Sequence, residues 1–181
     1  MPLRIFPVLG GANFSSEFNA VAREGMRQHL GNDLFAAERT PLLAVDDGII
    51  YFGNDPLGGQ VANLRANDGT LYYYAHLSAF AGDNRRQVRA GELIGYIGRT
   101  GNAASTSPHV HFEVHPGSGA IGRSPAVNPY PLLQLATRLQ PTSPVASSDA
   151  LRTLLPLAVL GTLGAGLWLW MRDNPSRIPV T

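Results

Sequence analysis

The sequence predicts an all-β domain of short antiparallel strands, followed by a linker and one apolar C-terminal helix. Three observations lead to this prediction. Short apolar and β-branched runs recur at close spacing, with turn residues between them. No helical segment alternates with these runs in the rhythm of a parallel sheet. Towards the C-terminus the composition changes to a proline-interrupted polar stretch and then to a long segment without charge.

The expected strands all lie in the middle of the chain. Turn signals such as Asp46-Asp47-Gly48 and Asn67-Asp68-Gly69 separate them, and 20 glycines and 14 prolines in 181 residues supply further turns. The pattern predicts five or six short strands, at 40–45, 49–52, 60–66, 71–77, within 88–98 and at 110–115.

The segments outside the strands give weaker signals. Residues 10–28 are polar and punctuated by glycine, with a short helix or a loop at 17–26, and a short helix is expected at 132–140. The first nine residues are too short and too interrupted by proline to form a secretory signal peptide.

The sequence predicts four regions: a folded domain at 1–137, a linker rich in proline and serine at 138–152, a transmembrane helix at 153–171 and a short tail at 172–181. Residues 153–171 carry no charge and, as a helix, would extend about 28 Å, close to the hydrocarbon thickness of a bilayer. Trp168 and Trp170 lie at one end, and Arg152 and Arg172 flank the segment. The alternative is a buried C-terminal helix, which needs a core large enough to cover it.

Composition excludes several classes of function and site. Fourteen basic residues against 13 acidic ones give no electrostatic basis for binding nucleic acid. Because the chain has no cysteine, it has neither disulfides nor thiolate metal ligands. Any bound metal must therefore be held by histidine and carboxylate side chains.

The segment Pro108-His109-Val110-His111-Phe112-Glu113-Val114 carries the strongest chemical signal. Side chains alternate between the two faces of a strand, so His109 and His111 point to the same side. Two neighbouring imidazoles suit one metal ligand and one acid/base group. The same pattern also occurs as two surface histidines on a half-exposed strand.

His29 and Asp33 complete a three-ligand site with one of these strand histidines, taken here as His111. Zinc accepts histidine nitrogen and carboxylate oxygen in a tetrahedral arrangement, and catalytic sites leave one position for water. We therefore expect one Zn²⁺ ion bound by His29, Asp33 and His111. The alternative for Asp33 is a turn or helix-capping role.

His109 is then free of the metal and is expected to act as the general base towards the metal-bound water. His76, in Tyr74-Ala75-His76-Leu77-Ser78, is the expected second catalytic residue, and its alternative is a surface histidine at a strand end. We expect a structural salt bridge for Glu113 and no role for His115.

These motifs occur in the order found in the lysostaphin-type (LytM-domain) zinc metallopeptidases, which the chain resembles. The matching segments cover about residues 7–131. They are His29-x-x-x-Asp33, Thr40-Pro41, Tyr74-Ala75-His76-Leu77-Ser78, Val88-x-Ala90-Gly91-x-x-Ile94-Gly95-x-x-Gly98-x-Thr100-Gly101 and Pro108-His109-Val110-His111-Phe112-Glu113-Val114.

The resemblance implies a two-layer antiparallel β-fold with a groove, and a zinc endopeptidase that cuts peptide cross-links of bacterial peptidoglycan. It implies the ligands His29, Asp33 and His111 and the catalytic histidines His76 and His109. The partners expected are stem peptides or cross-bridges, and a lipid bilayer through 153–171. Such a protein would be membrane-anchored, with its catalytic domain facing the periplasm or cell wall. The alternatives are a non-catalytic regulator or binding module of wall hydrolases, and a virion-associated lytic protein.

Overall fold

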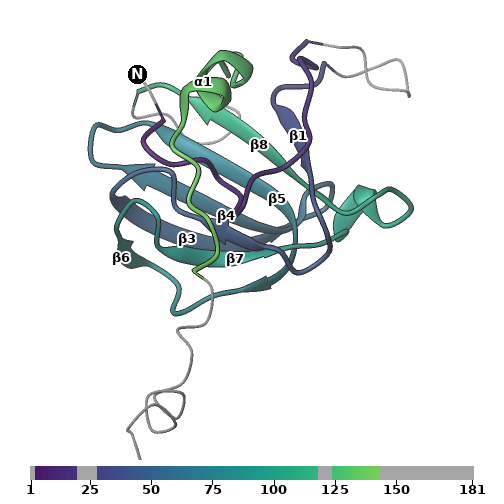
Figure 1. The fold of residues 1–181 in the computed structure, drawn as a ribbon, viewed down its shortest axis with the longest axis horizontal. Helices are drawn as coiled ribbons and strands as arrows, with labels where there is room; N and C mark the ends of the chain where they lie inside the picture. Colours follow the sequence, from purple (N-terminus) through teal and green to yellow (C-terminus); the bar gives the residue numbers. More distant parts are fainter. Residues whose placement is uncertain (1–2, 20–27, 118–123, 143–181) are drawn as a thin grey trace, which may run out of the picture. The chain divides into compact units, whose positions relative to one another are not determined.

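The structure, a computed structural model, describes residues 3–19, 28–117 and 124–142 (Figure 1). The chain divides into two units, Met1–Pro141 and Thr142–Thr181, and every strand and helix given below belongs to the first. Most of the predicted linker, the predicted membrane helix at 153–171 and the tail at 172–181 lie outside the described residues. Within the described ranges, no helix is both long enough and apolar enough to cross a membrane.

The described part of the chain forms eight strands and two short helices. These are β1 (Asn32–Phe35), β2 (Pro41–Leu43), β3 (Gly48–Asp55), β4 (Gly59–Ala66), β5 (Leu71–Phe80), β6 (Arg86–Val88), β7 (Leu93–Ile97), the 3-10 helix η1 (Gly101–Ala103), β8 (His109–His115) and α1 (Tyr130–Leu135).

All strand pairings are antiparallel, which confirms the all-β prediction. The main sheet has the order β1-β8-β5-β4-β3-β6, and β7 joins it by pairing with the end of β5 and with β2. Figure 1 shows β8, β5, β4 and β3 side by side, with the N-terminal segment and α1 over one face of the sheet.

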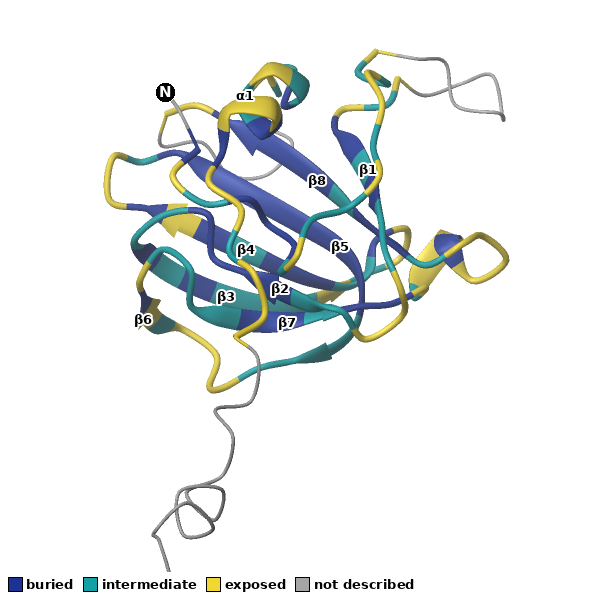
Figure 2. Ribbon diagram, in the orientation of Figure 1, coloured by how far each residue is buried: buried dark blue, intermediate teal, exposed yellow. Residues whose placement is uncertain are grey.

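The main core lies on that covered face. Alternate residues of the central strands, Tyr72 and Tyr74 of β5 and Phe112 of β8, are almost fully buried there. They pack in one cluster with Phe6 of the N-terminal segment and Leu133 of α1. In Figure 2, β5 and β8 are buried over most of their length. The opposite face of these strands is the one that carries the histidines.

The predicted turn at Asp46-Asp47-Gly48 is present, and it separates two strands that do not pair with each other. β2 pairs with β7, whereas β3 pairs with β4 and β6. The carboxylates of Asp46 and Asp47 accept hydrogen bonds from Arg4, and Asp47 accepts another from the backbone N–H of Ala90. These contacts fix the turn to other parts of the chain.

The C-terminal helix is shorter than the predicted 132–140. It ends at Leu135, and Ala136 is already extended. The backbone beyond it pairs with the N-terminal segment, where Thr137 O accepts from Phe6 N at 2.8 Å and Leu139 O accepts from Gly10 N at 2.8 Å. Tertiary hydrogen bonding therefore overrides the local helical tendency. Most of the helix or loop expected at 17–26 lies outside the described residues.

Candidate metal centre

β8 presents its polar residues on the face opposite the core. Val110, Phe112 and Val114 are buried in the main core. The alternate positions, His109, His111, Glu113 and His115, therefore share the other face, as the strand period predicts. This confirms that the two histidines of the H-x-H pattern lie side by side.

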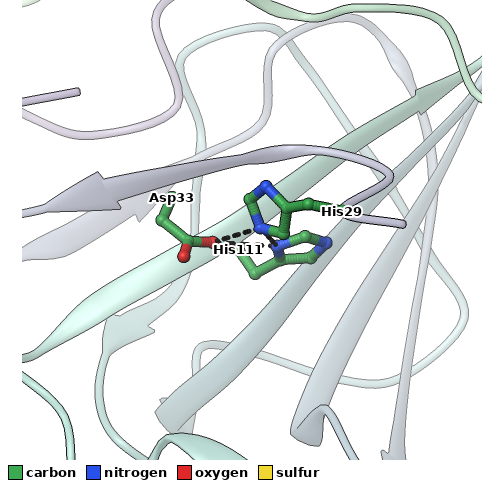
Figure 3. A group of neighbouring side chains, drawn as sticks. All are labelled: His29, Asp33 and His111. Atoms are coloured by element: carbon green, nitrogen blue, oxygen red, sulfur yellow. Dashed lines mark hydrogen bonds and ion pairs between the residues drawn. The ribbon is translucent and has the colours of Figure 1, made fainter. Parts of the chain in front are cut away.

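β1 brings Asp33 directly opposite His111. The two residues are cross-strand partners, and Asp33 Oδ1 lies 2.9 Å from His111 Nδ1. His29, which precedes β1, places its Nε2 3.0 Å from the same Asp33 oxygen and 2.9 Å from His111 Nδ1. The three predicted ligand residues thus meet in one triangle of donor atoms (Figure 3).

In His29 and His111, the outer nitrogen, which points away from the triangle, determines whether the inner nitrogen carries a proton or a lone pair. His29 Nδ1 lies 3.2 Å from the carbonyl oxygen of Glu17, and His111 Nε2 lies 2.9 Å from Glu113 Oε1. Both of these oxygens accept hydrogen bonds, so each outer nitrogen carries a proton. In the neutral rings, the inner nitrogens then present lone pairs to the carboxylate oxygen of Asp33.

Hydrogen bonds alone cannot make all three contacts of this triangle favourable. Each inner nitrogen carries at most one hydrogen, and Asp33 Oδ1 carries none when ionised, so three contacts share at most two protons. Whichever nitrogen is protonated, at least one contact joins two lone pairs or two N–H groups. A cation at the centre interacts favourably with all three atoms. Ligands about 2.0–2.1 Å from a tetrahedral zinc lie about 3.3–3.4 Å apart, so small side-chain movements accommodate the ion.

The ionisable groups around the triangle have strongly perturbed pKa values. Burial opposes ionisation of Asp33, but hydrogen bonds from His111 and His29 outweigh it and hold the carboxyl pKa far below its usual range. Burial likewise opposes protonation of His111, yet Asp33 and Glu113 raise its pKa to about 9. A proton on His111 is therefore the metal's competitor for this site.

His76 reaches the same face through a β-bulge. In β5, Tyr72 and Tyr74 belong to the main core, so strict alternation would place His76 there as well. The pairing of β5 with β4 shifts register between Gln60↔Leu77 and Ala62↔Tyr74, which leaves one extra residue in β5. His76 has a left-handed backbone, with φ of 67°, and its ring centroid lies 4.9 Å from that of His109.

His76 and His109 present equivalent nitrogens. His76 Nδ1 donates to the carbonyl oxygen of Thr100 at 2.9 Å, and His109 Nδ1 donates to that of Ser107 at 2.8 Å. Because both Nδ1 atoms carry protons, both Nε2 atoms are acceptors in the neutral rings. Burial, reinforced by the neighbouring His109, lowers the pKa of His76 to about 4, which keeps its ring neutral at physiological pH.

His109 lies next to the triangle and is almost fully buried. Its Nε2 is 3.9 Å from Asp33 Oδ2, the oxygen that the triangle does not use. The ring of Phe35, its cross-strand partner on β1, packs against it with centroids 5.1 Å apart. All five predicted site residues are thus brought together on one face.

Two contacts of the site were not anticipated from the sequence. His115 was expected to have no role, but it is 1% exposed and its Nε2 lies 2.7 Å from Glu113 Oε2. The salt bridge expected for Glu113 is present, and it joins His115 to the candidate ligand His111. The period-2 pattern, which places all four residues on one face, was the available signal. Thr100 appeared above only as a member of a matching motif, and in the structure its carbonyl oxygen accepts the Nδ1–H of His76.

Comparison with known proteins places this arrangement in a family. Residues 27–129 match the model of peptidase family M23, and this segment covers more than half of the chain. The chain belongs to peptidase family M23. Its lysostaphin-type character, inferred above from the motifs, is thereby confirmed.

Two relatives resemble the chain over more than half of its length. The DD-carboxypeptidase/endopeptidase Mpg of Neisseria meningitidis is 36% identical over 126 residues, which is 69% of this chain and 29% of that protein. The glycyl-glycine endopeptidase ALE-1 of Staphylococcus capitis is 38% identical over 111 residues, 60% of this chain and 30% of that protein. The chain thus spans less than a third of either relative.

A solved structure supports the same placement. The catalytic domain of the antimicrobial peptidase lysostaphin from Staphylococcus simulans superposes with a TM-score of 0.58 at 31% identity. The match covers 68% of this chain and 92% of that domain. The two proteins therefore share a fold over the matched part of this chain.

Proposed function

We propose that this protein is a zinc-dependent endopeptidase that hydrolyses peptide cross-links of bacterial peptidoglycan. One observation carries the proposal. Donor atoms of His29, Asp33 and His111 converge within 3.0 Å of one another, beside two histidines whose Nδ1 atoms are held by backbone carbonyls, which leaves each Nε2 as the proton acceptor. Membership of the M23 family supports peptide-bond hydrolysis as the reaction.

The donor set favours zinc over harder cations. Two imidazole nitrogens and one carboxylate oxygen suit zinc, whereas magnesium and calcium prefer oxygen ligands throughout. When bound there, zinc supplies a Lewis acid that polarises a peptide carbonyl and makes water acidic enough to act as a nucleophile near neutral pH. The single negative charge of Asp33 leaves the loaded site with net positive charge, which stabilises a developing oxyanion.

In this proposal, His109 is the general base. Its Nδ1–H is held by the Ser107 carbonyl, which fixes the ring and leaves Nε2 ready to accept a proton. His109 takes the proton from the attacking water at Nε2 and delivers it to the leaving amine. Because Nε2 of neutral His76 is also an acceptor, His76 orients the water and does not donate to the oxyanion.

The proposed substrate class follows from the lysostaphin-type resemblance, and relatives named as endopeptidases support it. The proposed partners are stem peptides or cross-bridges of peptidoglycan. We further propose that residues 153–171 anchor the protein in a bilayer, with the peptidase domain facing the periplasm or cell wall. This anchor is proposed from the uncharged sequence alone.

Digestion of isolated cell-wall sacculi tests the proposed activity. The purified full-length chain, loaded with zinc, is incubated with sacculi, and new amino groups are quantified before the products are identified by mass. We expect amino-group release that stops on chelation and returns with added zinc. The matched control is His109→Ala loaded with the same amount of zinc. A zinc-loaded wild-type chain that releases no amino groups from sacculi or cross-linked muropeptides would contradict the proposed function and favour a binding role.

A further inference from the structure

Behind the candidate metal centre, β8 carries a buried chain of hydrogen bonds that no step of the proposed reaction uses. His111 Nε2 lies 2.9 Å from Glu113 Oε1, and His115 Nε2 lies 2.7 Å from Glu113 Oε2. His115 Nδ1 in turn lies 3.0 Å from the carbonyl oxygen of Ser124. The chain therefore runs from a candidate ligand through a carboxylate and a second imidazole to the backbone.

Every polar atom along this chain has a defined role. Both oxygens of Glu113 accept hydrogen bonds, one from each imidazole, so its carboxylate has no freedom to rotate without losing a contact. Both nitrogens of His115 face acceptors, which is the arrangement of an imidazolium ring that donates twice. Glu113 is 9% exposed and His115 is 1% exposed, so water competes weakly for these contacts.

We propose that Glu113 and His115 are positioning residues that hold His111 as the tautomer whose Nδ1 faces the metal. Glu113 accepts the Nε2–H of His111, which leaves the Nδ1 lone pair directed at the triangle. His115 holds the second oxygen of Glu113 and, as a cation, balances its buried charge. The inference depends on the proposed metal site and goes beyond it, because it assigns a function to two residues outside the ligand set.

The strand geometry explains why this arrangement is rigid. His109, His111, Glu113 and His115 occupy successive positions on one face of β8, where the strand period brings neighbouring side chains together. The intervening residues are anchored in the core on the other face. A simple surface ion pair would not need a carboxylate shared between a partly buried imidazole, His111, and a fully buried one, His115.

Zinc affinity, measured apart from activity, tests the proposal. The dissociation constant of the full-length chain is obtained by competition with a chromophoric chelator, and folding is checked by thermal unfolding in chelator. Glu113→Leu removes the acceptor, Glu113→Gln retains an oxygen towards His111, and His115→Phe keeps a ring without donors. Val114→Ala is the matched control, because Val114 lies between the two residues and faces the core.

We expect Glu113→Leu to bind zinc about 10- to 100-fold more weakly than wild type, the loss typical of residues that orient a metal ligand. Glu113→Gln should recover most of this affinity, and His115→Phe should show a smaller loss than Glu113→Leu. Val114→Ala should lower the unfolding temperature while zinc affinity stays unchanged.

Two results would overturn the inference: folded Glu113→Leu with wild-type zinc affinity, or Glu113→Gln no better than Glu113→Leu. If Glu113→Leu does not fold, unchanged zinc affinity in His115→Phe would overturn it. A wild-type chain that binds no zinc would instead contradict the proposed function, so the two failures are distinguishable.

Discussion

Replacement of Thr100 by valine should impair His76 without touching any catalytic side chain. The Thr100 hydroxyl donates to Leu77 O at 2.9 Å and accepts from Gln60 N at 2.9 Å. It thereby fixes the loop whose carbonyl accepts the Nδ1–H of His76 at 2.9 Å. Valine keeps the shape of threonine but removes both hydroxyl hydrogen bonds.

The expected cost follows from these two bonds. Each half-buried hydrogen bond contributes about 1 kcal/mol, so Thr100→Val should lower the free energy of unfolding by about 2 kcal/mol. His76 already has a left-handed backbone, a conformation that costs about 1–2 kcal/mol and persists only while its surroundings hold it. We therefore expect the turnover number to fall by about tenfold or more, with a much smaller change in KM.

Urea unfolding in chelator and turnover on a defined cross-linked muropeptide measure the two effects. Thr100→Ser is the matched control, because serine retains the hydroxyl and should stay close to wild type in turnover. Equal turnover in Thr100→Val and wild type, under conditions where His76→Ala is impaired, would refute the role assigned to this loop.

Three further perturbations test other parts of the account. Asp33→Ala and His111→Ala should lose both bound zinc and hydrolysis. His109→Ala should keep zinc, measured by elemental analysis, and lose about 10²- to 10⁴-fold in turnover, measured by amino-group release. Near-normal turnover in His109→Ala would disprove its role as the base. With metal removed by a chelator, the free energy of unfolding should fall as the pH rises, because the pKa of His111 is raised from 6.5 to about 9 in the folded chain. This contribution, on the order of 3 kcal/mol at most, is complete below about pH 6.5 and lost as the pH passes about 9; urea midpoints that do not change between pH 6 and 9.5 would argue against the His111 contacts. Removing residues 151–181 should release the protein from membranes in a flotation assay, and a shortened chain that still floats would exclude the proposed anchor.

The sequence was most informative where a local period decides the structure. The alternation in β8 predicted that His109 and His111 share a face, because the apolar residues between and after them, Val110, Phe112 and Val114, are buried in the core on the other face. His29, Asp33 and His76 are distant from β8 in the chain. Metal-ligand chemistry indicated His29 and Asp33 as partners of a β8 histidine, and the order of motifs shared with a family then supported all three.

Features decided by tertiary contacts were not predicted. β1 is only four residues long and begins with Asn32 and Asp33, so it carries no apolar alternation. It becomes a strand because it pairs with the edge of β8. The bulge at His76 breaks the alternation set by Tyr72 and Tyr74, and nothing in the local sequence marks the extra residue.

The burial and contacts of His115 were missed for a related reason. Its partners are Glu113, two residues away on the same face, and the carbonyl of Ser124, which reaches it only in the folded chain. His115 follows the segment 108–114, and the sequence does not show that the end of this strand is buried. Four polar residues at period 2 on a central strand therefore indicate a hydrogen-bonded chain on one face.

X-ray absorption at the zinc edge of the reconstituted full-length protein tests the central claim most directly. We predict one zinc ion per chain, with two imidazole ligands and light oxygen ligands at about 2.0–2.2 Å. One imidazole should disappear from the spectrum in any His111→Ala protein that retains residual zinc. A wild-type chain that takes up no stoichiometric zinc, or a zinc environment unchanged by loss of His111, would contradict the account.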